Sequence, residues 1–339
     1  MVTSSVASET PVGGVRRRLA AMDQGYIVAG VLLALVVVFS VTLPGFFSTA
    51  NLLNAARSAS VLGLLAIGMA VVVIARGLDL SVVIIMSVSC AMAVELMLAG
   101  HGEAAALGAG LLIALGLGLV NGLLVAYVEV PPLFVTLATS LLYLGFFRLV
   151  LLPKDQQAVP AGASLMTWLG RGSVLGVPSP VLVLAAAAAL ATWFMSRNYG
   201  RFVRAQGDNP AAAALVGLPT RPLLVSTYLV SASAAFVAGV VGVSVAGSYD
   251  LRAAVTGTQL YDVIAVVVIG GVSLAGARGS IGGVVCAALL LGVIGNAMTL
   301  LNMSVIEQSL SKAFIVLLAI VLDSLLHPRD EETARAGDM

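Results

Sequence analysis

The stretch Ser196–Pro222, SRNYGRFVRAQGDNPAAAALVGLPTRP, is the longest polar interruption in the second half of a chain that is otherwise almost entirely apolar. It contains four arginines, at positions 197, 201, 204 and 221. Loops of membrane proteins that are rich in arginine and lysine stay in the cytoplasm. The stretch is therefore predicted to be a cytoplasmic loop between two membrane spans.

A short helix is predicted inside this loop. Asp208 and Asn209 supply a capping side chain, and Pro210 suits the first helical position. The helix continues with small side chains through residues 211–216 and stops at Gly217. A short helix held between two spans on the basic side of a membrane is typical of a docking element, so we expect a soluble protein partner.

Composition identifies the broad class. Of the 339 residues, 60% are hydrophobic and 10% are charged, whereas a soluble domain is about half apolar and a quarter charged. The formal net charge of +1 gives no sign of nucleic-acid binding. The two cysteines, Cys90 and Cys286, lie in apolar runs and indicate neither a disulfide framework nor a metal site. We expect an all-α, polytopic membrane protein.

The apolar runs predict about ten membrane-spanning helices. They fall at 26–43, 59–75, 80–99, 104–127, 133–152, 181–195, 223–245, 263–274, 281–301 and 313–326. We expect one transmembrane domain over 26–326 between cytoplasmic tails at 1–25 and 327–339. We expect an outer loop at 46–58, which can include an interfacial helix, and a longer outer segment at 153–180. This topology places eleven of the 17 lysines and arginines on the inner side, including Arg16–Arg18, so both ends are predicted to be cytoplasmic.

Two segments are too short or too rich in glycine for an ordinary span. One is RGLDLS at 76–81, and the other is GGVSLAGARGS at 270–280, which follows an apolar run of only about a dozen residues. Interrupted segments in both halves of a transporter indicate internal repetition and backbone that lines a cavity. Close helix packing through small residues is an equally good explanation.

The same segments belong to a set of four motifs that occur in order along the chain. They are GLDLS at 77–81, VPPLFVTLAT at 130–139, GDNPA at 207–211 and VIGGVSLAGARGS at 268–280. Together they resemble the permease subunits of ribose-type ABC sugar importers, and the similarity runs from about residue 46 to residue 323.

The resemblance implies the ribose/vitamin B12-type ABC importer permease fold in the bacterial cytoplasmic (inner) membrane. Two permease copies, identical or paralogous, would form the pathway for a monosaccharide or related polyol. Two ATP-binding subunits, which carry ATP and Mg, would dock below, and a periplasmic or lipid-anchored solute-binding protein would deliver the sugar. The chain itself would be a transport subunit rather than an enzyme, with no cofactor of its own.

By this resemblance, the loop at 196–222 is the ATPase-coupling loop. The residues expected to form it are Arg201, Gly207, Asp208, Asn209, Pro210, Ala211, Ala212, Ala213 and Gly217. The chain departs from the family pattern at Ala211 and Ala214, where a glutamate and an arginine are usual, and at Leu260, where an acidic residue is common. These departures leave the class intact but bear on the substrate and the ATPase contacts.

The sequence lacks features with which a transporter would supply its own energy for uptake. It has no Gly-x-x-x-x-Gly-Lys-Ser/Thr phosphate loop, and its spans contain few ionisable residues. An ion-coupled secondary transporter of a small polar solute, which is the alternative, more often has carboxylates deep in the bundle. A passive channel would have no reason to carry a docking helix, and a membrane enzyme would need a catalytic constellation that is not visible here. We therefore expect separate ATPase subunits to supply the energy.

Four polar residues of the fifth predicted span share one helical face: Thr136, Thr139, Ser140 and Tyr143. Their hydroxyls can exchange hydrogen bonds with a sugar, and a tyrosine ring offers it an apolar face. Bonding back to carbonyls of the same helix is about equally favoured. In the family that the chain resembles, the fifth and tenth spans flank the pathway, so these residues, with Phe134, are expected to line it.

Three further polar residues have simpler interpretations. Asp79 is predicted to cap the third span together with Ser81, or else to face an aqueous vestibule as part of the pathway. Asn121 and Asn296, each in an apolar helix, are predicted to form interhelical hydrogen bonds worth about 1 kcal/mol.

Overall fold

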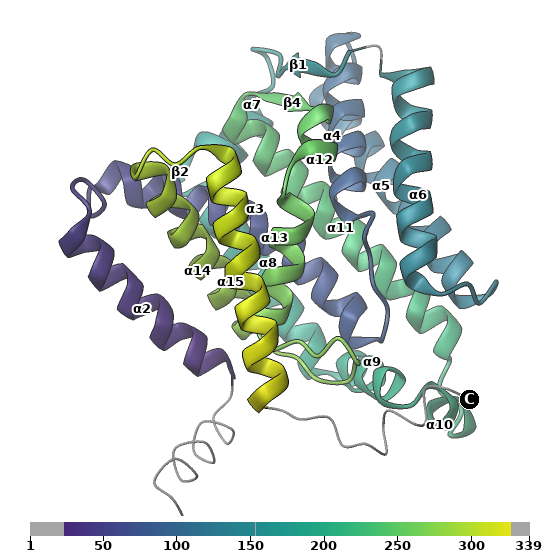
Figure 1. The fold of residues 1–339 in the computed structure, drawn as a ribbon. Helices are drawn as coiled ribbons and strands as arrows, with labels where there is room; N and C mark the ends of the chain where they lie inside the picture. The colour runs from purple at the N-terminus through teal and green to yellow at the C-terminus, as the bar shows by residue number, and fades with distance from the viewer. Residues whose placement is uncertain (1–23, 153, 327–339) are drawn as a thin grey trace, which may run out of the picture.

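The computed structural model of the protein describes residues 24–152 and 154–326, so the predicted tails, with Arg16–Arg18, lie almost wholly outside the described residues. Ten helices form the bundle in the described residues, and most of them run from one end of the molecule towards the other (Figure 1). They are α2 Gln24–Thr42, α3 Thr49–Ile74, α4 Val82–Leu98, α5 Glu103–Ala126, α6 Pro132–Phe146, α8 Ser179–Ser196, α11 Thr220–Ala246, α13 Gln259–Ile269, α14 Ile281–Leu300 and α15 Val305–Leu326.

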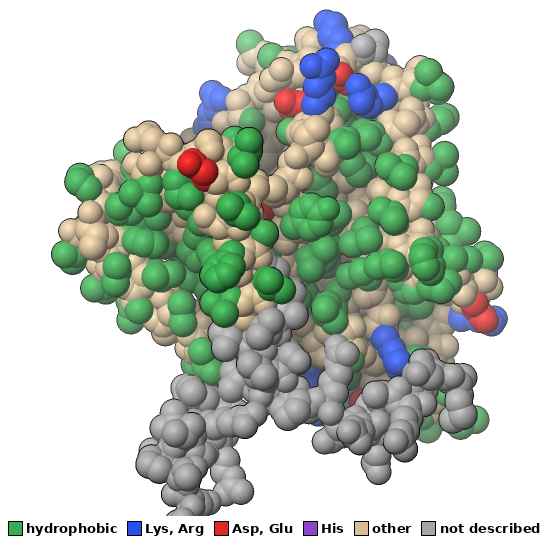
Figure 2. All heavy atoms as spheres, viewed as in Figure 1, with side chains coloured by type: hydrophobic (Ala, Val, Ile, Leu, Met, Phe, Trp, Pro, Cys, Tyr) green, Lys and Arg blue, Asp and Glu red, His purple; other side chains and the backbone are tan. Residues whose placement is uncertain are grey.

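The surface has the pattern of a membrane protein. Seven of the described helices are long and apolar enough to cross a bilayer, counting α6 together with the π-helical turn η1, Phe147–Leu151; α4 and α13 are shorter apolar helices. Figure 2 shows hydrophobic side chains over a broad middle band, with charged side chains gathered towards the ends. The nearly all-helical architecture confirms the predicted fold class, while the count of about ten spans stays a prediction.

Helix α3 forms the centre of the bundle. Every residue from Gly63 to Ile74 is buried, and α3 packs against α8, α11, α13 and α14. Small residues allow this close packing: a Cβ placed on Gly68 would lie 3.1 Å from the Cα of Ser231 in α11. The segment 46–58, predicted as an outer loop that can include an interfacial helix, is helical from Thr49: Ser48 caps the helix, which continues without a break as α3.

Both glycine-rich interruptions are breaks between helices. The connector at 75–81 separates α3 from α4, and the loop at 270–280 follows α13. At 1.5 Å per residue, the 11 residues of α13 extend about 16 Å, about half of the 30 Å apolar core of a bilayer. The first turn of α13 is tied to α15 by an ion pair in which Lys312 Nζ lies 2.8 Å from Asp262 Oδ2.

The long segment at 153–180 is partly structured, which the sequence analysis did not predict. It contains β1 Gln156–Ala158, α7 Ser164–Arg171, β2 Ser173–Val174 and β3 Val177–Pro178. Strand β1 pairs antiparallel with β4, Ser248–Asp250, and α12, Leu251–Thr256, follows β4. The β1–β4 pair therefore ties the chain leaving η1 to the chain leaving α11, at the end of the molecule opposite α9 and α10 (Figure 1).

The start of α2 and the end of α15 lie at the same end of the molecule as α9, Asn198–Asp208, and α10, Pro210–Leu215 (Figure 1). We call this the inner end and the opposite one the outer end. The relative arrangement is the one that the predicted topology requires. Which end faces the cytoplasm stays a prediction from the arginine distribution.

A reciprocal amide pair joins α3 to α14. Asn51 Nδ2 donates to Asn296 Oδ1, and Asn296 Nδ2 donates to Asn51 Oδ1, both over 2.8 Å. This confirms the interhelical bond predicted for Asn296.

Replacing one member of the pair is expected to leave the other amide without its partner. Asn296→Leu should lower the free energy of unfolding by about 1 kcal/mol, and the double change with Asn51→Leu should recover part of the loss. Thermal unfolding in detergent measures the effect. Ser58→Leu, at an exposed position of the same helix, is the control and should change stability little; equal stability of Asn296→Leu and wild type would contradict the prediction.

Candidate functional site

The predicted docking helix is present as α10. Asn209 has an extended backbone with φ −147° and its side-chain oxygen accepts the N–H of Ala212 over 3.0 Å, while Pro210 occupies the first turn. The stop is at Gly217, whose φ of +83° suits a residue without a side chain and whose N–H donates to Ala214. The predicted limits are thus confirmed to within one residue, and the cap is Asn209 rather than Asp208.

Preceding α10 is α9, a helix that the sequence analysis treated as loop. Its inward face includes Val203, which is fully buried, while Arg201 is exposed and bonds to Asn198. Arg204 donates to the carbonyl of Met195 at the end of α8 over 2.8 Å. Frequent polar residues and glycine concealed this helix, although the four-residue spacing of Tyr199 and Val203 is helical. The docking segment, residues 198–217, is therefore anchored to the bundle by α9 and ends in α10.

The surface of α10 is apolar although it lies at the inner end. Leu215 is 89% exposed and Val216 is 77% exposed, and Ala211, Ala212 and Ala214 are also exposed. We call these five residues the α10 tip. Ala213 is the exception, because it is 4% exposed and faces the protein. Exposed apolar groups clustered on a short helix are typical of a contact surface for another protein.

The polar stripe of α6 lies inside the single chain. Thr136, Thr139, Ser140 and Tyr143 are all buried, whereas Phe134 is 62% exposed on another face of the helix. Thr136 donates to the carbonyls of Pro132 and Leu78, and Thr139 and Ser140 donate to carbonyls of their own helix. The structure thus brings the stripe together but leaves Phe134 apart from it. The lining role of all five residues stays a prediction.

The stripe leads into a buried polar network centred on Asp79, which is 1% exposed. Asp79 accepts the N–H of Ser81 over 3.1 Å, the Ser81 hydroxyl over 2.6 Å and the Ser231 hydroxyl over 2.7 Å. Asn121 donates to Ser81 Oγ over 2.7 Å, which confirms its predicted interhelical bond, and accepts from Tyr143 over 2.9 Å.

We call these five residues the Asp79 network. It joins the connector at 75–81 to α5, α6 and α11. Asp79 closes a turn before α4, and the side chain of Ser81 makes no capping bond to that helix. The expected capping is therefore met only in part. A buried polar group is stable only when it is hydrogen-bonded, so these bonds constrain how the four elements pack.

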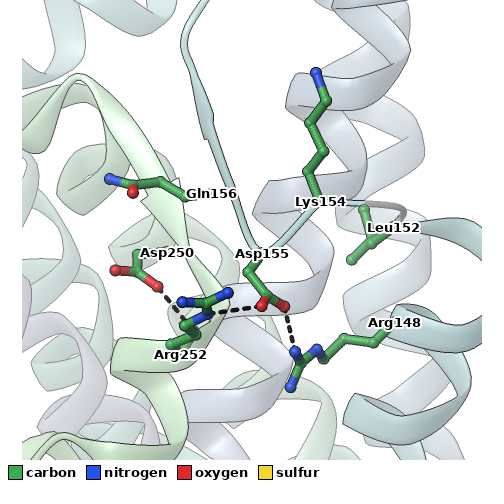
Figure 3. Close-up of a pocket in the computed structure, with 7 residues that line it drawn as sticks. All are labelled: Arg148, Leu152, Lys154, Asp155, Gln156, Asp250 and Arg252. Atoms are coloured by element: carbon green, nitrogen blue, oxygen red, sulfur yellow. Dashed lines mark hydrogen bonds and ion pairs between the residues drawn. The ribbon is translucent and has the colours of Figure 1, made fainter.

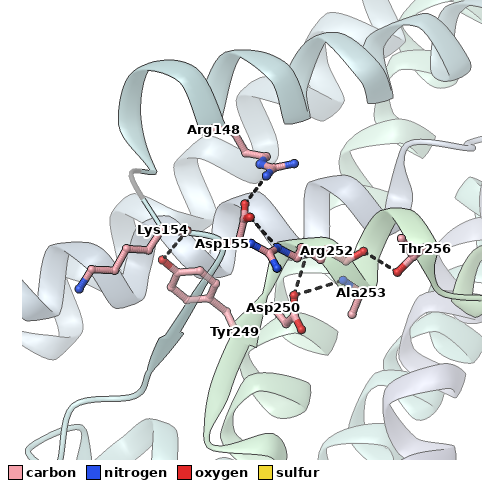
Figure 4. A network of polar contacts seen from close by, with 8 residues as sticks. All are labelled: Arg148, Lys154, Asp155, Tyr249, Asp250, Arg252, Ala253 and Thr256. Carbon is pink, nitrogen blue, oxygen red and sulfur yellow. Dashed lines mark hydrogen bonds and ion pairs between the residues drawn. The ribbon is translucent and has the colours of Figure 1, made fainter.

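A cavity of about 510 Å³ opens at the outer end, and the sequence analysis did not predict it (Figure 3). Its lining comes from η1, the segment before and at the start of β1, the end of β4, and α12: Arg148, Leu152, Lys154, Asp155, Gln156, Asp250 and Arg252. Two guanidinium groups share one carboxylate (Figure 4): Arg252 Nε lies 2.7 Å from Asp155 Oδ2, and Arg148 pairs with Oδ1.

The charges of this outer cavity are unbalanced. The hydrogen bond from Arg252, together with both arginine charges, holds the pKa of Asp155 below its usual value of 3.8. The carboxylate of Asp155 is therefore ionised at neutral pH and its ion pairs are intact. They are lost only as the pH falls below the usual pKa of an aspartate and the carboxylate is protonated. Asp250 caps α12 by accepting the N–H of Arg252 over 2.8 Å. With Lys154, three cations line the cavity against two carboxylates.

Comparisons with known proteins agree with the motifs. The family model described as "Branched-chain amino acid transport system / permease component" matches residues 51–322. The chain is 34% identical to the ribose import permease protein RbsC of Escherichia coli (strain K12), over 89% of this chain and 94% of the relative. It is 31% identical to the L-arabinose ABC transporter permease protein AraH of Azospirillum brasilense, over 87% of each chain.

The D-allose transport system permease protein AlsC of Escherichia coli (strain K12) is 30% identical, over 87% of this chain and 90% of the relative. No solved structure matches the chain. A family match over most of the chain, with relatives that it covers almost end to end, confirms the resemblance in the four motifs. The chain therefore belongs to the branched-chain amino acid transport system / permease component family, whose members are permease subunits of ABC transporters.

Proposed function

We propose that this chain is the transmembrane permease subunit of a binding-protein-dependent ABC importer for a monosaccharide or related polyol. The relatives are named for ribose, L-arabinose and D-allose, which supports a sugar over the amino acids in the family description. The chain works in the bacterial inner membrane with both termini in the cytoplasm. A second permease copy, identical or paralogous, completes the pathway, and two partner ATPase subunits bind ATP and Mg.

The α10 tip is the observation that carries this proposal. Exposing a leucine side chain to water forgoes about 1.5–3 kcal/mol that burial would provide. Leu215 and Val216 are exposed on a capped helix at the inner end, where a soluble ATPase can cover them. Their apolar surface compensates for the glutamate and arginine that the family places at Ala211 and Ala214, because docking then depends on burial more than on ion pairs.

The outer cavity is the docking point that we assign to the solute-binding protein. Cations are disfavoured on the outer side of membrane proteins, yet Arg148, Lys154 and Arg252 gather around one cavity there. Asp155 is shared by both arginines and Asp250 caps a helix, so the cavity keeps excess positive charge. A carboxylate on the surface of the delivering protein matches that charge.

We propose that the polar stripe of α6 lines the route of the sugar through the membrane. Its hydroxyls bond within the chain in this structure, so a passing sugar has to replace those bonds as the route opens. Thr136 differs from its neighbours because it also donates to Leu78, outside its own helix, over 3.2 Å. The stripe is therefore placed to respond to movement of the connector at 75–81.

Charged substitutions on the α10 tip are expected to abolish ATPase association. Leu215→Asp and Ala212→Asp each place an unpaired charge in the docking contact, which should cost about 2 kcal/mol or more, roughly thirtyfold in affinity. The measurement is co-purification of the ATPase, alongside uptake. Leu175→Asp makes the same change at a fully exposed turn of the outer end and should retain the ATPase. Normal ATPase association and normal uptake in both tip variants would show that the loop only connects two spans and does not dock the ATPase.

Reversing the charge of Arg252, which is 74% exposed, should weaken docking of the solute-binding protein about tenfold, mainly through a slower association rate. Arg252→Gln should give a smaller effect, because it removes the charge without reversing it. Surface binding kinetics at two ionic strengths measure both, and the salt dependence should fall together with the charge. Unchanged rates and unchanged salt dependence in Arg252→Glu would exclude the outer cavity as the docking point.

Thr136→Val and Thr139→Val keep the side-chain shape and remove a hydroxyl. If the stripe lines the route, uptake should fall in both while membrane insertion and ATPase association persist. Thr136→Val should also lose about 0.6 kcal/mol of stability, because only Thr136 bonds outside its helix. Uptake in proteoliposomes and thermal unfolding separate the two effects, and normal uptake in the double variant would restrict the hydroxyls to a structural role.

A further inference from the structure

Three segments from distant parts of the chain meet at the inner end of α3. The N–H of Ala277 donates to the carbonyl of Ile74 over 2.9 Å. Gly207, near the end of α9, lies so close that a Cβ there would be 1.9 Å from the Ile74 oxygen and 2.6 Å from the Ala277 nitrogen. A Cβ on Gly276 would be 2.7 Å from the Gly207 oxygen. We call these four residues the Ile74 junction.

The junction joins two of the four motifs, GDNPA at 207–211 and VIGGVSLAGARGS at 268–280, to the last residue of α3, which lies three residues before the GLDLS motif. The loop between α13 and α14 lies beside α9 in Figure 1. Both glycines of the junction are contact points of backbone with backbone, where no side chain can separate the segments. A displacement of α9 must therefore move Ile74 and the loop at 270–280 directly.

The backbone on either side of the contact is strained. Arg76 has φ +66° and Ala277 has φ +64°, in the left-handed region that residues with a side chain seldom adopt. Such a conformation is unfavourable and persists only where its surroundings hold it in place. A positive φ at Ala277, within the contact, and at Arg76, two residues beyond Ile74, indicates that the meeting of the segments sets these positions and that local preference does not.

Five residues beyond Ile74, the same connector reaches the Asp79 network. The carbonyl of Leu78 accepts from Thr136 of α6 over 3.2 Å and from Tyr228 of α11 over 3.3 Å. Asp79 follows immediately, with its bonds to Ser81 and Ser231. A shift of Ile74 therefore displaces the acceptors to which α6 and α11 are bound.

A buried polar atom beside the junction has no partner. Gln206, next to Gly207, is 6% exposed, and its Oε1 has no hydrogen bond among the described residues. Buried acceptors are nearly always hydrogen-bonded, so an unpaired one calls for a reason. This oxygen therefore marks Gln206 as a place where the contacts beside the junction leave an acceptor unpaired.

We infer that the Ile74 junction couples the docking segment to the Asp79 network, with Gly207 and Gly276 as positioning residues. Movement of α9 and α10 at the ATPase is transmitted through backbone contact to the connector at 75–81, and from there to α6 and α11. This inference rests on the proposed function, because it assumes an ATPase at the α10 tip. It adds that docking and coupling are separable within one short segment.

The test uses alanine substitutions in the full chain, assembled with its ATPase and solute-binding protein. Gly207→Ala forces α9 away from Ile74 and leaves the α10 tip intact. Stimulation of ATP hydrolysis by the loaded binding protein should fall at least tenfold, and so should uptake of radiolabelled ribose, L-arabinose or D-allose, whichever wild type takes up. Gly276→Ala approaches the junction from the other segment and should behave in the same way. ATPase association is compared in Gly276→Ala, whose site lies outside the docking segment, and should stay within twofold of wild type there.

The control is Gly116→Ala in α5, where a Cβ meets nothing within 4 Å; it should keep stimulation and uptake within twofold. If neither junction variant inserts into the membrane, Ser231→Ala is the deciding variant, because it removes one donor to Asp79 without steric change. It should lose the stimulation of ATP hydrolysis while ATPase association persists. Normal stimulation in the inserted variants overturns the inference, and so does loss of ATPase association in Gly276→Ala. Failure of wild type to associate with an ATPase would instead overturn the proposed function.

Discussion

A carboxylate buried in an apolar bundle has to be surrounded by hydrogen-bond donors, and in this protein Asp79 imposes that requirement on four elements at once. Its donors come from Ser81 and from Ser231 of α11, and Ser81 is in turn bound by Asn121 of α5. Apolar packing between membrane helices is weakly specific, because lipid and protein interior are alike in polarity. The Asp79 network supplies the directional contacts that determine which helices lie together around the connector.

Local chemistry was predictable from the sequence because it depends on neighbouring residues. The capped start of α10 at Asn209, its stop at Gly217 and the shortness of α13 all follow from side-chain type and spacing. The interhelical roles of Asn121 and Asn296 followed from polarity alone, although their partners did not. Asn51 and Asn296 lie more than 200 residues apart in the chain, and only the packing of their helices makes them partners. One sequence contains no information on such packing.

The orientation of helices was not predictable, for a physical reason. Periodicity placed the α6 hydroxyls on one face, but in a membrane protein both the core and the lipid accept apolar side chains, so the pattern does not say which face is buried. The structure turns Thr136 inward and leaves Phe134 exposed. The outer cavity was missed similarly, because its charges come from Arg148, Asp155 and Arg252, which only the β1–β4 pairing brings together.

The β1–β4 pair also determines where the bundle can move. It fastens the outer ends of the α6 and α11 segments, with Gln157 opposite Tyr249, so this pair would be the pivot of any tilt of α11. Helix α11 has 27 residues and so is about 40 Å long. At that length a tilt of about 3° about the pivot sweeps the inner end through about 2 Å, enough to break a hydrogen bond there while the outer end hardly moves. For a given tilt, the inner end of α11 is therefore the part of the helix that changes position most.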